Sequence, residues 1–231
     1  MRLNLSAIKR NALFLLTCCL SLSAWAVPAG LVSHLSGPLF AQGSSGAVRS
    51  LSVNSVVEEG DILVTEKNTF ARLKLKDGAE VLLRPASQLR LQKYSYDENK
   101  PEADAAVMDL VKGGLRTVTG MIGKRGDRSV YRLEAATATI GIRGTDYDAH
   151  LCTGNCGPIP DGLYVDVHGG AVSITNSGGV SIVTEGQRSF IQSRFTPPAP
   201  PPPNILPPVF RPPPTVGQPG TQTTGGSCLV R

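Results

Sequence analysis

Two short segments of the chain carry the residues best suited to chemistry. Asp146, Asp148 and His150 alternate along the first, and Asp166 and His168 alternate along the second. Alternate residues of a β-strand point to the same face, so pairing of the two segments would gather carboxylates and imidazoles on one surface. Such a set can bind a cation, which makes Asp148, His150, Asp166 and His168 candidate metal ligands. A solvated strand face produces the same alternation without a ligand, and we predict no bound metal or cofactor.

The cysteines form a second chemical group. Cys152 and Cys156 stand in a C-x3-C spacing, which can close a short disulfide loop in an oxidising compartment. A metal site is the alternative, and it would need more ligands than this one pair. Cys228 has no obvious partner and is expected to be free or to bridge to another chain.

Signatures of common enzymes are missing from the sequence. It contains no G-x-S-x-G, no H-E-x-x-H and no P-loop. The three histidines, His34, His150 and His168, have no serine or cysteine at a recognisable catalytic spacing. We therefore predict a protein that is not an enzyme.

The first 26 residues are typical of an export signal. Arg2, Lys9 and Arg10 precede an apolar run over Ala12–Leu22, and the small residues of an A-x-A site end at Ala26. A run of about eleven residues is too short for a membrane span, which needs roughly 20. We expect cleavage after Ala26, with an uncleaved anchor helix as the alternative.

Removal of this signal changes the charge of the protein. The 231-residue chain has a formal net charge of +5, and the first 26 residues contribute three basic residues and no acidic one. The mature chain is then near neutral at +2, whereas non-specific nucleic-acid binding requires many phosphate contacts. We expect no nucleic-acid partner, no transmembrane segment in the mature chain, and a periplasmic or secreted location.

Residues 31–195 are predicted to form one all-β domain. Hydrophobic and polar residues alternate over Ala71–Lys76 and Leu163–His168, and Asp77-Gly78 supplies a hairpin turn. Short strands separated by glycine-rich turns are typical of a single sandwich or a jelly-roll or barrel-like fold.

The composition changes at residue 196. Residues 197–214 contain eleven prolines in eighteen positions, and such a segment favours extended polyproline II conformations over a packed core. We predict a disordered tail over residues 196–231. It would serve as a spacer from a surface or as a segment that a partner binds.

Several motifs of the predicted strands resemble, in order, those of FecR-type domains. The resemblance covers about residues 31–192. Its most specific stretch is Ala138–Tyr147, similar to the family pattern A-x-[apolar]-G-[apolar]-R-G-T-[acidic]-[aromatic]. The residues that match family motifs are Gly60, Asp61, Thr65, Gly141, Arg143, Gly144, Thr145 and Asp146.

The resemblance implies a bacterial periplasmic all-β domain with a sensory or interaction role and no catalysis. The expected function is that of an exported, non-catalytic binding, sensory or interaction module in envelope signalling, and its expected partner is an envelope protein or polymer. Two alternatives remain open. One is a structural component of the envelope or cell-surface assembly, and the other is a carbohydrate-binding module.

Two basic features have a structural and a functional interpretation. Arg143 either ties its turn together as a buried or half-buried guanidinium, with Asp146 or another carboxylate as partner, or faces a ligand. A local basic cluster is either a solvated hairpin tip or a contact for an acidic envelope partner. That cluster comprises Arg116, Lys124, Arg125, Arg128 and Arg132.

Overall fold

The computed structural model describes residues 27–125, 130–154 and 156–203. The predicted export signal with its cleavage point after Ala26, the cluster member Arg128, Cys228 and the tail from residue 204 onward lie outside these ranges. No helix within the described part of the chain has the length and hydropathy needed to cross a membrane.

Nearly all regular structure is β-strand, which confirms the all-β prediction. The strands are β1 (Pro28–Leu35), β2 (Leu39–Gln42), β3 (Val48–Leu51), β4 (Val56–Glu58), β5 (Ile62–Thr65), β6 (Ala71–Leu75), β7 (Glu80–Leu83), β8 (Gln88–Ser95), β9 (Ala105–Val118), β10 (Tyr131–Ala135), β11 (Thr139–Cys152), β12 (Gly162–Asn176), β13 (Gly179–Thr184) and β14 (Arg188–Ile191). A 3-10 turn, η1 (Pro101–Ala103), and one helical turn, α2 (Ile122–Arg125), complete the fold.

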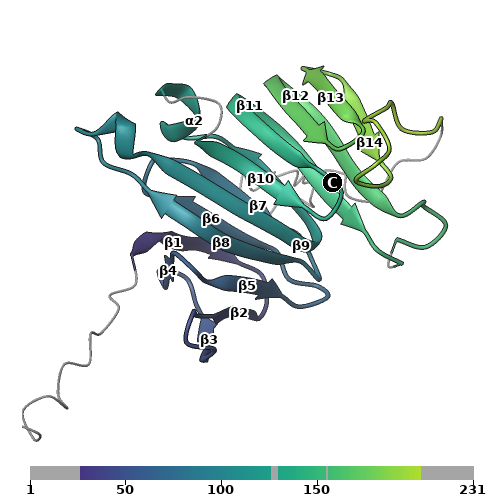
Figure 1. Cartoon of the computed structure of the whole chain (residues 1–231). Helices are drawn as coiled ribbons and strands as arrows, with labels where there is room; N and C mark the ends of the chain where they lie inside the picture. The colour runs from purple at the N-terminus through teal and green to yellow at the C-terminus, as the bar shows by residue number, and fades with distance from the viewer. Residues whose placement is uncertain (1–26, 126–129, 155, 204–231) are drawn as a thin grey trace, which may run out of the picture.

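The strands form one 14-stranded sheet in which three long strands take part in two sets of pairings (Figure 1). The first half of the sheet runs β13-β12-β11-β10-β9-β8-β5-β2-β3, and the second half runs β14-β12-β11-β9-β7-β6-β1-β4. The strands β9, β11 and β12 therefore belong to both halves. The pairing of β9 with β10 is parallel, and the other pairings are antiparallel.

Each long strand changes its buried face once, at glycine. In β11 the side chains that face the core include Ile140 and Ile142 before Gly144, and Tyr147 and Ala149 after it. Buried and exposed side chains alternate along the strand, and this pattern moves by one residue at Gly144. There φ is +60° and the register with β12 is irregular, as in a β-bulge. Equivalent shifts occur in β9 and β12. A bulge bends its strand, and the shifts keep apolar side chains directed at the same core on both sides of this bend in the sheet.

The bulges of β11 and β12 fit directly against one another. Gly170 has φ of +79°, and a Cβ at this position would lie 2.5 Å from the carbonyl oxygen of Gly144. A side chain at Gly170 would therefore meet both backbone strain and a collision. The G-G and R-G-T sequences on these strands are needed for this close approach.

The beginning of the proline-rich segment lies against β14. The amide of Phe190 donates to the carbonyl of Ala199 over 2.6 Å, and the amide of Ala199 donates back to Phe190 over 3.1 Å. These bonds form an isolated antiparallel bridge. The predicted end of the domain is residue 195, and this bridge brings residues just beyond it into contact with the domain.

Candidate functional site

The pairing of β11 with β12 brings the predicted chemical residues together. Asp148 lies opposite Asp166, and His150 lies opposite Tyr164. The same face continues across the second half of the sheet, because β9 pairs with β11 and β7 pairs with β9 in a matching register. The outer surface formed in this way is called the polar face below.

Three cross-strand rows make up the polar face. The Arg72 row contains Arg72, Leu82, Arg116, Asp148, Asp166 and Arg188, from β6, β7, β9, β11, β12 and β14. The Val118 row contains Leu31, Lys74, Glu80, Val118, Asp146 and Gly169. The His150 row contains Gly114, His150, Tyr164, Phe190 and Ala199.

Asp148 has the least exposed side chain of the three acids Asp146, Asp148 and Asp166 on the polar face. Its side chain is only 3% exposed, and it accepts a short hydrogen bond from the guanidinium of Arg84. Its other oxygen lies 2.6 Å from Nε2 of His168. A buried carboxylate needs such partners to offset its lost hydration.

The two neighbouring acids are bound by arginine as well. Arg116 donates to both carboxylate oxygens of Asp146 over 2.9 and 2.8 Å, and this bond is the main cause that raises the pKa of Arg116. Arg188 donates to Asp166 over 2.9 Å. A cation at this cluster would have to displace guanidinium groups from the carboxylates, so the geometry favours an ion network over a ready-made metal site.

His150 lies between this network and the disulfide, close enough to Arg84 and Asp148 to interact with their charges. Cys152 and Cys156 are joined, and Nε2 of His150 lies 3.3 Å from Sγ of Cys156. Burial, together with the nearby charge of Arg84, lowers the pKa of His150 from 6.5 to about 4. The imidazole is therefore neutral at physiological pH.

Gly60, Asp61 and Thr65, the first residues that match the family motifs, lie in or beside turns and make contacts that stabilise the fold. Asp61 is buried and accepts two hydrogen bonds from Arg49, over 2.9 and 2.6 Å, and a third from the amide of Glu58 over 2.8 Å. Gly60, just before it, has φ of +87°. Thr65 donates to the carbonyl of Arg84 and accepts from the amide of Ser87. These residues stabilise turns between strands, and Arg49 is a partner that the sequence motifs do not identify.

The prediction that Asp146 could be the partner of Arg143 is wrong. Arg143 is exposed, while Asp146 is bound on both oxygens by Arg116. The irregular register between Arg143 and Asp146 is the physical reason, because it breaks the simple spacing from which a contact would be inferred. Gly141, in the regular part of β11, lies opposite Ser173, and Thr145 is buried just after the bulge.

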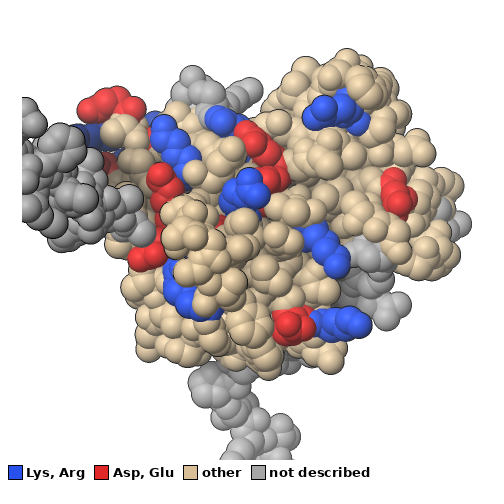
Figure 2. Space-filling model, turned by 60° about the horizontal axis from the view of Figure 1, so that its bottom comes forward, with Lys and Arg blue, Asp and Glu red and all other residues tan. Residues whose placement is uncertain are grey.

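The predicted basic cluster is largely neutralised by acids. Arg125 binds both carboxylate oxygens of Asp104 and lies over the ring of Tyr96 at 4.7 Å, and Arg132 binds Glu134. Lys124 is exposed. On the surface that Figure 2 presents, basic and acidic side chains are interspersed between neutral ones. This surface does not form one extended field of a single sign.

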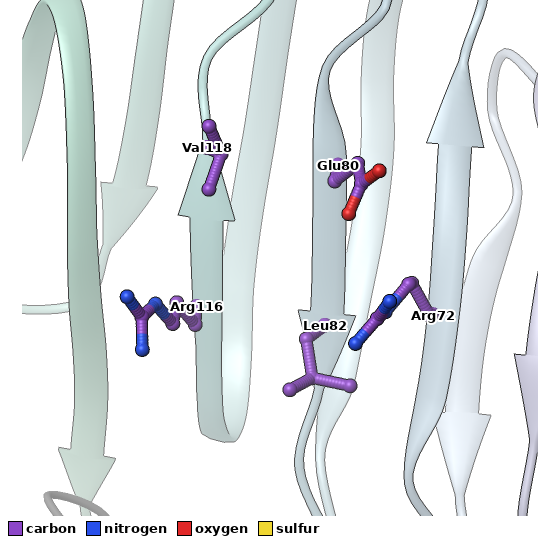
Figure 3. Close-up of a pocket in the computed structure, with 5 residues that line it drawn as sticks. All are labelled: Arg72, Glu80, Leu82, Arg116 and Val118. Carbon is purple, nitrogen blue, oxygen red and sulfur yellow. The ribbon is translucent and has the colours of Figure 1, made fainter. Parts of the chain in front are cut away.

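An open groove lies on the polar face beside the ion network, on the side formed by β6, β7 and β9. It has a volume of about 190 Å³ and is lined by Arg72, Glu80, Leu82, Arg116 and Val118 (Figure 3). Leu82 lies between the two arginines, and Val118 is 46% exposed. The guanidinium of Arg72 has no hydrogen bond or ion pair with any residue that the structure describes. Small-molecule pockets usually enclose roughly 300 Å³ or more, so the groove suits a flat macromolecular partner better.

The fold and the site define an all-β domain with a charged, mostly ion-paired sheet face. The sequence model of the FecR protein family matches residues 61–173, from Asp61 just before β5 to Ser173 near the end of β12. This part of the chain is a FecR domain. Strands β1–β4, β13 and β14 lie outside the match.

Other comparisons found less. No curated protein matches the chain. Two crystal structures of a candidate anti-sigma factor from Parabacteroides distasonis are similar in part, at 11% and 12% sequence identity and a TM-score of 0.47. The similar region covers 60% of this chain and 57% of theirs.

Proposed function

We propose that the protein is an exported, non-catalytic binding module that acts in envelope signalling through its FecR domain. The observation that carries this proposal is the family match over residues 61–173, which covers the long strands that build the polar face. A periplasmic or secreted location is proposed with it, from the export signal predicted in the sequence and the cysteine pair in an oxidised state.

We assign partner binding to the groove around Leu82. Arginine is enriched in protein interfaces, and the buried core of an interface is more apolar than its rim. Here the groove combines Arg72 with the apolar side chains of Leu82 and Val118. The acids Asp146, Asp148 and Asp166 of the polar face are already held in ion pairs, so their charges are not free to bind a partner at low cost. Binding at the groove requires no rearrangement of Asp148 or Asp166.

Site-specific cross-linking in intact cells tests this function. A photo-reactive amino acid replaces Leu82 in the groove or, as a matched control, Ile182 on β13, which is 54% exposed and outside the polar face. We expect the Leu82 position alone to capture an envelope signalling protein, such as a membrane-bound sigma regulator or an outer-membrane receptor. The added substitution Arg72→Glu should reduce that product.

Other outcomes would replace the proposal. Capture of peptidoglycan or a surface polymer would support a structural component or a carbohydrate-binding module. Equal yields at Leu82 and Ile182 would remove the groove as the binding site. Cell fractionation and mass spectrometry of the mature amino terminus test the location, and recovery in the cytoplasm with residues 1–26 retained would contradict export.

A further inference from the structure

The connection between β11 and β12 places three metal-binding side chains at one corner of the domain. The donor atoms of His150, Cys152 and Cys156 lie within 4.8 Å of one another. Two of these donors are sulfurs and the third is an imidazole nitrogen. Thiolate and imidazole are the ligands that Zn²⁺ prefers, and thiolate favours thiophilic metals in general.

The disulfide occupies the sulfur donors in the oxidised protein. Cys156 is half-buried, whereas Cys152 is buried at 1% exposure. Cys156 is therefore the sulfur more accessible to an external thiol. The Cα atoms of the two cysteines are 5.6 Å apart, a separation from which two free thiolates can reach one ion.

The distances suit a metal ion once the thiols are released. Tetrahedral Zn²⁺ with the usual Zn–S and Zn–N bonds separates a sulfur from a nitrogen by about 3.5 Å and two sulfurs by about 3.8 Å. Nε2 of His150 already lies 3.3 Å from Sγ of Cys156. After reduction, the two sulfurs need only move from the separation of a disulfide bond to that of two ligands of one metal ion.

The imidazole of His150 is held in place by packing. It lies opposite Tyr164 on β12 and Gly114 on β9, and a Cβ at Gly114 would collide with Nδ1 of His150. Within the described ranges, this buried Nδ1 has no hydrogen-bond partner. Nε2 is therefore the nitrogen that faces the sulfurs, and the ring does not need to be recruited from solvent.

Charge also favours a dithiolate site here. Arg84 and Asp148, which pair with one another, both interact with His150, so the network offers no unpaired carboxylate here to offset the charge of an added cation. Two thiolates neutralise the charge of a divalent metal, so the loaded site adds no net charge to this corner. Carboxylates of the ion network do not have to leave their arginine partners.

We propose that reduction of the Cys152–Cys156 disulfide creates a binding site for a thiophilic divalent metal of the Zn²⁺ type. The ligands are Sγ of Cys152, Sγ of Cys156 and Nε2 of His150, with water in the fourth position. This site is separate from the groove around Leu82, and it does not depend on the signalling function proposed above.

The reducing co-reactant is an external dithiol. One of its thiolates attacks Sγ of Cys156, which forms a mixed disulfide and releases Cys152 as a thiolate. The second thiolate of the dithiol then displaces Cys156, so the dithiol leaves as a disulfide and two electrons are transferred to the protein. The cysteines take up the two protons of the dithiol. Metal binding to both sulfurs releases two protons to solvent.

Metal titration of the reduced and oxidised whole chain tests this proposal. The protein is reduced with a phosphine, desalted without oxygen, and titrated with Co²⁺ and then Zn²⁺. We expect one equivalent of Co²⁺ to produce thiolate-to-metal charge-transfer absorption in the reduced protein only, and Zn²⁺ to displace it. Competition with a chromophoric chelator then measures the Zn²⁺ affinity.

Variants separate the ligands from their surroundings. Cys156→Ser should abolish the charge-transfer signal of the dithiolate, and His150→Gln should weaken Zn²⁺ binding by roughly tenfold or more. His34→Gln is the matched control, because His34 lies on β1 and outside the cluster. Equal binding by oxidised and reduced protein, or unchanged affinity in His150→Gln, would overturn the proposal.

Circular dichroism covers the case in which reduction loosens the fold. If the reduced protein keeps its strand signal, the titration is interpreted as it stands. If that signal is lost, one equivalent of Zn²⁺ should restore it in the wild type and not in Cys156→Ser. Failure of Zn²⁺ to restore it would equally overturn the proposal.

Discussion

Asp148 and Asp166 lie directly opposite one another on adjacent strands, and both are nearly buried. Two like charges in this arrangement repel, and each also loses hydration. The protein offsets both effects with basic groups from other strands: Arg84 and His168 bind Asp148, and Arg188 binds Asp166. The polar face is therefore stable only as a complete network.

Replacement of Arg84 by Met should strongly destabilise the domain. Arg84 is 7% exposed, and its removal leaves the charge of Asp148 buried with only His168 as partner. Loss of one member of a buried pair costs about 3 kcal/mol or more in the free energy of unfolding, measurable by urea denaturation.

Arg72→Met is the control for this experiment. Arg72 lies on the same face and is exposed, so its replacement should change stability by about 0.5 kcal/mol or less. Adding Asp148→Asn to Arg84→Met should recover part of the loss, because the unpaired charge is removed. Similar costs for Arg84→Met and Arg72→Met would show that the network does not stabilise the fold.

Gly170→Ala should be more harmful than Gly186→Ala. Both glycines have positive φ, +79° and +75°, so both substitutions carry a similar backbone cost of about 1 kcal/mol. Only at Gly170 does the new Cβ meet the carbonyl of Gly144, whereas Gly186 has open space around it. We expect an additional loss of about 1–3 kcal/mol at Gly170 from overpacking, and equal melting temperatures of the two variants would contradict the close fit of the bulges.

Mild acid should destabilise the oxidised protein through His150. The pKa of this imidazole is lowered to about 4 in the folded state from 6.5, so the unfolded chain binds the proton more tightly. Stability is then complete above about pH 6.5 and falls as the pH decreases towards 4, by about 3 kcal/mol in all.

The comparison with His150→Gln isolates this effect. The variant has no titrating group at position 150, so its stability should fall less between pH 6.5 and 4 than that of the wild type. Chemical denaturation at a series of pH values measures the difference. Parallel pH profiles for the two proteins would show that His150 is not protected from protonation.

Loss of the disulfide should have a moderate effect on stability. Cys152 and Cys156 are four positions apart, and closing so short a loop removes little entropy from the unfolded chain. The double substitution Cys152→Ser, Cys156→Ser should cost about 2 kcal/mol. The measurement is the urea midpoint of the variant in metal-free buffer, with the reduced wild type as the reference for loss of the bond alone. A midpoint of the variant equal to that of the oxidised wild type would contradict this prediction.

The fold could be predicted from the sequence because alternation is local. The turn at Asp77-Gly78 and the alternating runs on β6 and β12 each reveal a strand or hairpin within a few residues. The pairing of β11 with β12 was a condition of the shared-face hypothesis, and the structure contains this pairing. The charged side chains could therefore be assigned correctly to one shared face.

The partners of those charges could not be predicted in the same way. Arg84 and Asp148 are 64 residues apart in the sequence, and their contact depends on β9 lying between β7 and β11. The Arg143–Asp146 prediction failed because one extra residue at a bulge changes which side chains are neighbours. Alternation identifies a face, whereas ion-pair partners depend on the order and register of the strands.

The bend in the sheet has a mechanical consequence. Because β9, β11 and β12 each pass through it, three continuous backbones connect the two halves, and none of these connections is a loop that could act as a hinge. A load that a bound partner applies to the groove reaches β8 and β13 along covalent paths as well as through the core. The domain should respond to such a load as a single stiff body.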